Sequence, residues 1–385
     1  MNGHKTKRTD EPQAATGRGD TTPAAQLMGK VAVLRTSPDT VLGDIAEAMR
    51  LAGAASALSS QHETILKINI SWQHYYPACS TTPWQLEGVV KALLDLGHRA
   101  EGLIPAQNRT VVVDPRIGAV NNRHDPVLKR YHLTPVWLFE EGVEWITYEP
   151  EREMLALKDI FPDGITIPKL FIGKNALHLP TMKTHVFTTT TGAMKNAFGG
   201  LLRDNRHWCH ARIHEALVDL LTIQQEIHPG LFAVMDGTIA GDGAGPRAME
   251  PVVKNYLLAS ADQVAIDAIA AKMMGFDPME LDYIRMAHEQ GLGVGTPSEI
   301  EVLGEDIGGV SFGFRMRETF ASRGQKLIYH GWLKSCEKLL LRSWVVPWSY
   351  LASNLYYNLF WFNIHGRKRV EAAMKTPWGK LFRTY

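Results

Sequence analysis

The stretch from Leu179 to His214 concentrates the side chains best suited to chemistry on an anion. Its 36 residues include two Lys, four His and three Arg, and a run of four Thr is followed by Gly192. Lysine places a point charge on a phosphate or carboxylate, and His exchanges protons near neutral pH. We therefore expect a site for a small anionic compound here, with Lys183 and Lys195 as its main cations.

The same stretch supplies most of the candidate site residues. In an enzyme, the lysines would hold the anion, while His185 or His210 would act as general base or metal ligand. The catalytic candidates are therefore Lys183, His185, Lys195 and His210. The candidates for substrate binding are Lys67, Asn69, Thr191, Asn196, Arg203, Arg206 and Asp236. The alternative is a capped loop with solvated lysines and no ligand.

Three histidines follow with helical spacing. His207, His210 and His214 are three and four residues apart, so a helix would place them on one face. Such a face could ligate zinc, another divalent metal or a nickel-type cofactor, although protein zinc sites usually take ligands from more than one segment. Phosphate contact, proton transfer and plain surface exposure are the alternatives.

The elements that would position these residues can be read from residue order. The run Thr188–Thr191 followed by Gly192 is typical of a loop that leads into a helix, which we expect to start near Ala193. The free amides and positive dipole end of that helix would face the loop and favour an anion. Lys195 and Asn196 would project close by.

The N-terminal third predicts the fold class. Residues 30–36 and 64–70 read as strands and residues 40–55 as the helix between them, which is the pattern of a parallel α/β sheet. We therefore expect an α/β protein with a mainly parallel sheet flanked by helices. Lys67 and Asn69 fall on one face near a strand end, where open α/β sheets bind ligands.

Two aspartates beyond His214 need an explanation. Asp236 ends an apolar strand, 231–237, and precedes a glycine-rich loop, 237–246, so it could contact a ligand or simply form a turn. The loop does not match the spacing GxGxxG, which excludes a Rossmann dinucleotide motif. Asp267 lies within an apolar helix, where a lone carboxylate is costly to bury, so we expect Lys183 or Lys195 to pair with it.

Six segments in order carry a family resemblance. They are KINI (67–70), LPTMKTH (179–185), TGAMKNAFGG (191–200), VMDGTIAGDGAGP (234–246), LLASADQVAIDAIAAKMMGFDP (257–278) and IEVLGED (300–306). In this order they resemble the domain of unknown function 362 family, over roughly residues 30 to 306. The resemblance implies a fold and a site map more than a reaction, and it gives weight to Lys67, Asn69 and Asp236.

Many members of that family are associated with a ferredoxin-like iron–sulfur module, and this chain departs from that pattern. Its three cysteines, Cys79, Cys209 and Cys336, are far apart and form no CxxC motif. We therefore expect no cysteine-ligated cluster, and the three scattered thiols favour a reducing compartment.

Composition narrows the class of protein. The 385 residues are 45% hydrophobic and 21% charged with a net charge of +1, so there is no general electrostatic case for nucleic acid. Residues 1–29 lack the apolar run of a secretory signal and read as a disordered leader, so a cytoplasmic location is expected. We divide the rest into a core, 30–310, with two lobes around a cleft near 179–246 as one option, and a helical extension, 311–385.

The extension contains an uncharged, aromatic-rich stretch. Residues 343–364 carry no formal charge, but their Pro and Asn residues weaken insertion across a bilayer. Apolar residues at helical spacing between 341 and 364, flanked by cations, are typical of a helix at a membrane surface. The alternatives are contact with a partner protein, packing on the core and a homodimer.

Two functions follow as hypotheses. The first is an enzyme that acts on a small anionic substrate, a carboxylate or a phosphate, in a cleft lined by Lys and His. The alternative is a non-catalytic binding or assembly protein that works with an iron–sulfur or membrane-associated partner.

Overall fold

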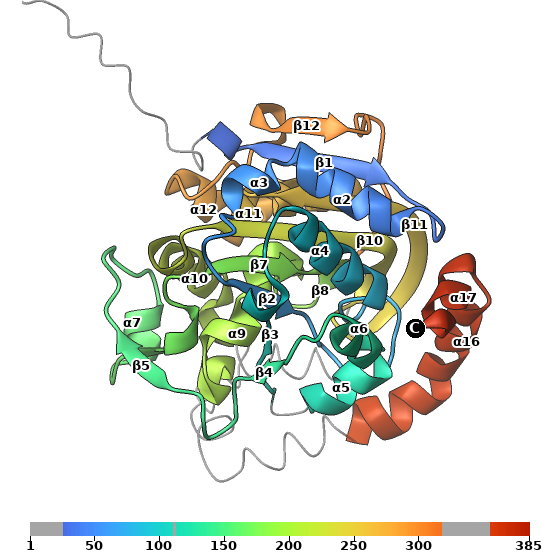
Figure 1. Cartoon of the computed structure of the whole chain (residues 1–385), viewed down its shortest axis with the longest axis horizontal. Coiled ribbons are helices and arrows are strands. Elements are labelled where there is room, and N and C mark those ends of the chain that lie inside the picture. The colour runs from blue at the N-terminus through green and yellow to red at the C-terminus, as the bar shows by residue number, and fades with distance from the viewer. Residues whose placement is uncertain (1–25, 111–112, 318–354) are drawn as a thin grey trace, which may run out of the picture.

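The computed structural model describes residues 26–110, 113–317 and 355–385 (Figure 1). The predicted leader up to residue 25, Cys336 and the first part of the predicted aromatic helix, 341–354, lie outside the described residues.

A mixed sheet forms the centre of the molecule. Its strands run in the spatial order β12 (Glu301–Gly304), β1 (Lys30–Arg35), β11 (Ala248–Ser260), β10 (Leu231–Ala244), β7 (Asn175–Leu179), β2 (Thr64–Ile68), β3 (Leu103–Gln107) and β4 (Val136–Trp137). The pairs from β10 to β4 are all parallel, and only β11 runs antiparallel to both of its neighbours. The predicted α/β class with a mainly parallel sheet is therefore confirmed.

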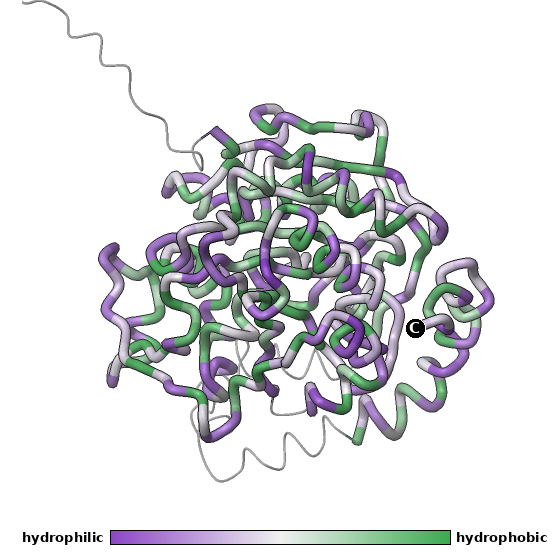
Figure 2. Tube along the Cα trace, viewed as in Figure 1, coloured by the Kyte–Doolittle hydropathy of each residue, from purple (hydrophilic) through white to green (hydrophobic). Residues whose placement is uncertain are grey.

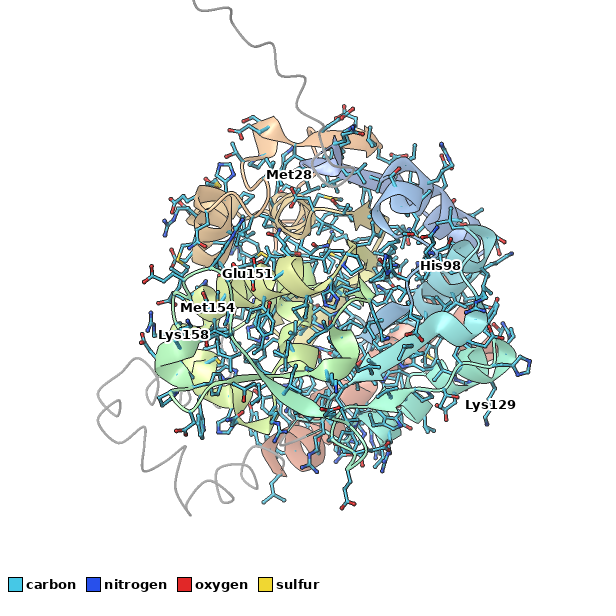
Figure 3. The ribbon with its side chains drawn as sticks, turned by 60° about the vertical axis from the view of Figure 1, so that its left-hand side comes forward. Met28, His98, Lys129, Glu151, Met154 and Lys158 are labelled. Carbon is cyan, nitrogen blue, oxygen red and sulfur yellow. The ribbon has the colours of Figure 1, made fainter. Side chains whose placement is uncertain are left out.

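Helices cover both faces of this sheet, and each face has its own buried apolar cluster. One face carries α2 (Val41–Leu51), α3 (Ala54–Ala57), α4 (Pro83–Asp95), α5 (Pro115–Asn121) and α6 (His124–Arg130). The other carries α7 (Leu157–Ile160), α8 (Gly192–Asn196), α9 (Phe198–Leu201), α10 (Ile213–Ile227), α11 (Gln263–Met274) and α12 (Asp282–Glu289). In Figure 3, Met154 and Lys158 accordingly lie on the opposite side of the ribbon from His98 and Lys129.

Smaller elements complete the described chain. A separate two-stranded sheet pairs β5 (Trp145–Tyr148) with β6 (Ile165–Pro168), and β9 (Thr189–Thr190) pairs with β8 (Thr181–His185). The short 3-10 helices are η1 (Ala100–Gly102), η2 (Lys169–Phe171), η4 (Pro278–Glu280) and η5 (Pro297–Glu299), and η3 (Asp204–Arg212) is a longer one.

Helix α4 shows how local sequence sets an element. Thr82 accepts a hydrogen bond from the amide of Gln85, whose side chain accepts one from the Thr82 amide, and Pro83 occupies the first turn. This capping box satisfies amides that would otherwise lack partners. Gly97, with φ of +88°, follows the helix end. Residue types next to each end of this helix therefore account for where it starts and stops.

The glycine-rich segment after Asp236 is not the loop that we expected. Strand β10 continues to Ala244 and pairs with β11, with Gly241 opposite Pro251. A Cβ atom at Gly241 would lie 2.4 Å from the Met249 Sδ and 3.1 Å from the Lys183 Cβ. The glycines therefore allow close packing inside a sheet, and the prediction of a flexible loop is wrong.

The C-terminal helices pack on the same domain. They are η7, a π-helix (Leu355–Gly366), α16 (Arg367–Met374) and α17 (Pro377–Thr384), drawn in red at the edge of Figure 1. The Trp378 indole donates to Asn255 Oδ1 (2.7 Å) and lies 5.1 Å from the ring of Trp84. The expected helical extension is confirmed for these residues, along which apolar and polar stretches alternate (Figure 2). Among the described residues, no helix combines the length and apolar character needed to span a bilayer.

Candidate functional site

Strand β8 places Lys183 at the carboxyl edge of the parallel strands. Its ammonium group is fully buried and donates to the Cys79 carbonyl (2.6 Å), to Thr181 Oγ1 (2.9 Å) and to Ser71 Oγ (3.4 Å). All three acceptors are neutral. Burial lowers the pKa of Lys183 to about 8, and the Cys79 side chain opposes that shift.

Asn69 lies beside Lys183. Its side-chain amide donates to the Cys79 carbonyl (3.3 Å) and to Thr181 Oγ1 (3.4 Å), which are two of the groups that Lys183 contacts. The loop after β2 and the strand β8 therefore present a lysine and an amide together.

Lys195 belongs to helix α8, which contacts strand β8. Its Nζ lies 5.3 Å above the Phe198 ring, and the side chain is half-buried. Burial, followed by repulsion from Lys183 and Arg206, lowers the pKa of Lys195 to about 7. Lys183 and Arg206 thus each lie close enough to Lys195 to affect its charge.

The start of α8 already holds a carboxylate. Asp267 of α11 accepts hydrogen bonds from the amides of Ala193 (2.5 Å) and Met194 (3.1 Å). A Cβ atom at Gly192 would lie 2.2 Å from this carboxylate, and Gly192 has φ of +69°. The expected anion at this helix start is therefore a side chain of the protein itself. The predicted pairing of Asp267 with Lys183 or Lys195 is wrong, because two backbone amides take the role of the cation.

His185 and His210 flank a small aromatic wall. The Phe187 ring lies 5.9 Å from His185 and 5.2 Å from His210, and the Phe198 ring lies 5.8 Å from His210. Since Phe198 also carries the Lys195 ammonium group on its face, this wall joins both histidines to Lys195.

The hydrogen bonds assign different tautomers to the two histidines. His185 Nδ1 accepts from the amides of Phe187 (3.2 Å) and Thr188 (3.4 Å), so its Nε2 carries the proton. His210 Nδ1 lies 2.8 Å from the His207 carbonyl and must donate to it, so its Nε2 is the unprotonated nitrogen. His185 is thus a hydrogen-bond donor and His210 an acceptor or base.

Their surroundings disfavour the protonated form of both histidines. Burial holds the pKa of His185 well below its usual range, and repulsion from Lys195, His210, Lys183 and His214 adds to the effect. Burial lowers the pKa of His210 to about 4, against the opposing hydrogen bond to the His207 carbonyl. The structure therefore brings together four predicted residues: Lys183, His185, Lys195 and His210. We call these four the Lys/His cluster.

Lys67 borders the Lys/His cluster through Arg206. Its buried ammonium group donates to the Ile68 carbonyl (2.5 Å) and to Gln107 Oε1, and burial and the Arg206 charge hold its pKa well below the usual range. Asn196 donates to the Lys67 carbonyl (2.8 Å), which ties α8 to strand β2. Nothing in the sequence marked Gln107 as the partner of Lys67.

Arg203 faces a surface hollow of about 430 Å³. It lies over the Trp145 ring, and the hollow is also lined by Asn108 and Arg109 at the end of β3. Arg206 donates to the carbonyls of Arg203 (3.2 Å) and Arg109, two residues that line this hollow.

Two further predicted binding residues, Asp236 and Thr191, form hydrogen bonds with other residues of the protein. The Asp236 carboxylate is buried and accepts from the Thr238 amide (2.7 Å), the Trp84 indole (3.0 Å) and Thr82 Oγ1. Thr191 precedes α8, and its amide donates to the Lys183 carbonyl (3.1 Å). These contacts position the strands and α8 around the cluster.

The three histidines with helical spacing do not share one α-helix. His207 and His210 lie in the 3-10 helix η3, and only His214 lies in α10, because the α-helix starts at Ile213. The spacing therefore spans two consecutive helices of different kinds, and the placement of all three histidines on one face stays a prediction. Within the parts of the chain that the structure describes, no group of three or more His, Cys, Asp or Glu side chains is placed to hold a metal ion.

Comparison with known proteins identifies a relative and a family. The chain is 30% identical over 133 residues to thylakoid-associated protein sll1697 of Synechocystis, a match that covers 33% of this chain and 39% of that protein. This chain thus spans well under two thirds of the length of that relative. No solved structure matches the chain. The family model described as Domain of unknown function (DUF362) matches residues 64–272, which include β2, the Lys/His cluster and most of α11, so this chain belongs to that family.

Proposed function

We propose that this chain is an enzyme that binds a small anion, a carboxylate or phosphate compound, at the Lys/His cluster and acts on it there. The observation that carries the proposal is three lysine side chains, two buried and one half-buried, without a negative partner. No Asp or Glu of the described residues forms an ion pair with Lys67, Lys183 or Lys195. A buried charge is costly unless it is paired, so an anion that enters the cluster is favoured.

The cluster offers a distinct role to each side chain. Lys183, on neutral acceptors, supplies the charge that holds an anionic oxygen, and His185 Nε2–H donates a hydrogen bond. Lys195, with a pKa of about 7, gives up or takes a proton near neutral pH, and His210 Nε2 accepts one. An oxygen acid can therefore be held and a proton transferred at one place.

Anion binding is tested by calorimetric titration of the full chain with inorganic phosphate and with succinate. Replacing two charged donors to one anion, in Lys183→Ala with Lys195→Ala, should weaken binding at least about 100-fold. The matched control is Lys158→Ala with Lys169→Ala, because these lysines are exposed and already paired with Glu. Unchanged affinity in the first double variant would sink the proposal.

The identity of the anion and the catalytic step need a second measurement. Mass spectrometry of the compound released from the denatured purified protein should find a carboxylate or phosphate compound. Incubation of that compound with the native chain, and with Lys195→Met, should give a product only with the native chain. Recovery of the compound unchanged in both samples would favour binding without catalysis.

A second candidate is a non-catalytic protein that works with an iron–sulfur or membrane-associated partner. The observation in its favour is that the curated relative is named thylakoid-associated. Isolated membranes mixed with the purified protein would test it. Binding of the native chain to these membranes, together with no binding of a variant with substituted surface residues, would support this candidate.

A further inference from the structure

Exposed apolar side chains gather on two helices far from each other in the sequence. Eight large hydrophobic side chains of the described residues are exposed, and five of them belong to α5 and η7. They are Ile117 and Val120 on α5, and Leu355, Phe360 and Ile364 on η7. Val120 and Phe360 are the most exposed, at 58% and 57%. Large apolar residues concentrated in this way mark a contact surface.

Helices α5 and η7 both contact the same loop, residues 70–76. Asn121 of α5 donates to the Gln73 carbonyl (2.6 Å), and the Phe362 ring of η7 stacks on His74 at 4.3 Å. Since adjacent residues of the loop hold them, α5 and η7 form one face, which Figure 1 shows at the lower right.

The π-helical geometry of η7 separates an inner side from an outer side. Trp361 and Phe362 pack on the ring of Trp72, at 6.0 and 5.2 Å. Residues four and five apart recur on one side of a π-helix, so Phe360 and Ile364 point away from that contact. The outer side is therefore apolar although the inner side already has its packing partners.

Positive charge continues from this face along α16 and α17. Residues 355–385 contain six basic residues and a single acidic one, Glu371, whereas the whole chain has a net charge of only +1. The exposed cations are Arg367, Lys368, Lys375, Lys380 and Arg383. An apolar helix surface continuous with such a basic segment matches the chemistry of an anionic membrane surface.

We propose that the face formed by α5, η7, α16 and α17 binds a membrane surface that contains anionic lipids. The side chains of Val120, Phe360 and Ile364 enter the boundary between headgroups and acyl chains, while Arg367 and Lys368 contact lipid phosphates. A second copy of this chain is a poorer occupant, because a two-fold interface would bring the basic segments of both copies together.

The proposal is tested by sedimentation of the full chain with vesicles. Vesicles of phosphatidylcholine mixed with phosphatidylglycerol should bind the protein, and added salt should weaken binding. Phosphatidylcholine alone should bind it poorly. Both Phe360→Ser with Ile364→Ser and Arg367→Glu with Lys368→Glu should reduce partitioning at least about tenfold.

Matched controls use exposed residues elsewhere on the surface. Met28→Ser with Ile172→Ser removes the same kind of apolar side chain, and Lys91→Glu with Arg99→Glu reverses the same amount of charge. Both should bind vesicles like the native chain. Circular dichroism of each variant should show an unchanged fold.

Two results would overturn the proposal. One is sedimentation with anionic vesicles no greater than without them. The other is a stable dimer that Phe360→Ser with Ile364→Ser converts to a monomer while vesicle binding stays absent, because a second copy would then cover this face. Neither result bears on the Lys/His cluster, so the two proposals are tested independently.

Discussion

At the scale of single residues, the notable feature is cations held in places that favour their neutral form. Lys183, Lys195 and Lys67 donate only to neutral oxygens or lie over an aromatic ring. A lysine can change its charge when its surroundings disfavour the ammonium form, which an arginine cannot do. The arrival of an anion would restore that charge.

This feature predicts a pH dependence of stability. The folded pKa of Lys195, about 7, is below its ordinary value of 10.5. Between these values the unfolded chain binds more protons than the folded chain, so the Lys195 contribution to the free energy of unfolding rises with pH. Lys195→Met, which removes the charge at similar volume, should stabilise the anion-free protein most at and below pH 7, and this gain should shrink as the pH approaches 10.5.

Urea unfolding of both proteins at several pH values from about 6 to about 9 measures this difference. Lys169→Met is the control, because Lys169 is exposed and pairs with Glu144, so its effect should be small. A gain from Lys195→Met that does not change with pH would contradict the prediction.

At the scale of elements, α8 is built around an aspartate from another helix. The Asp267 carboxylate sits where a Cβ atom at residue 192 would lie, and it accepts hydrogen bonds from the amides of the second and third residues of α8. This contact orients the short helix that carries Lys195 and Asn196. A glycine and an acid 75 positions apart therefore set the geometry of the site.

The contact between Gly192 and Asp267 predicts that adding one methyl group at residue 192 strongly lowers the stability of the protein. Gly192→Ala would place that methyl group on the Asp267 carboxylate, at a φ that disfavours alanine, and should lower the free energy of unfolding by about 2–4 kcal/mol. Gly43→Ala is the matched control, because Gly43 lies in helix α2 with nothing near its Cβ position. That change should raise stability by about 0.5–1 kcal/mol. Equal effects of the two substitutions in denaturant unfolding would contradict this account of α8.

At the scale of the whole molecule, the C-terminal helices complete the core on the α4 side. Trp378 and Phe382 are buried members of the apolar cluster that also contains Trp84 and Tyr76, and Phe382 stacks on Tyr75 at 3.9 Å. The predicted separate extension, 311–385, is thus in contact with the core wherever it is described, while the division of the chain into 1–29, 30–310 and 311–385 stays a prediction.

This packing predicts a large loss of stability from a residue near the C-terminus. Trp378→Ala removes a fully buried indole and its hydrogen bond to Asn255, and should destabilise the whole protein by about 3–5 kcal/mol. Phe360→Ala, an exposed position, should change stability by less than about 0.5 kcal/mol. Thermal unfolding measured by calorimetry separates the two. Unfolding of the C-terminal helices in a separate transition would show that they are not part of the core.

Sequence alone determined the features that depend on neighbours along the chain. The capping box of Thr82 with Pro83, the alternation of strands and helices that predicts an α/β sheet, and the position of Lys67 and Asn69 at a strand end all follow from local order. The ordered motifs also identified the family. These signals act over a few residues, where backbone geometry and side-chain spacing are sufficient.

Tertiary structure alone decided which distant groups meet. Asp267 could be recognised as needing a partner, but only the packing of α11 on α8 made that partner a pair of amides. The glycines after Asp236 read as a loop until β8 and β11 were placed against them, and the start of α10 at Ile213 left His207 and His210 in a 3-10 helix. Each outcome depends on contacts between segments far apart in the chain, where packing overrides local preference. The meeting of Lys183 with Lys195 is of the same kind, because β8 and α8 are brought together by the sheet and by Asp267.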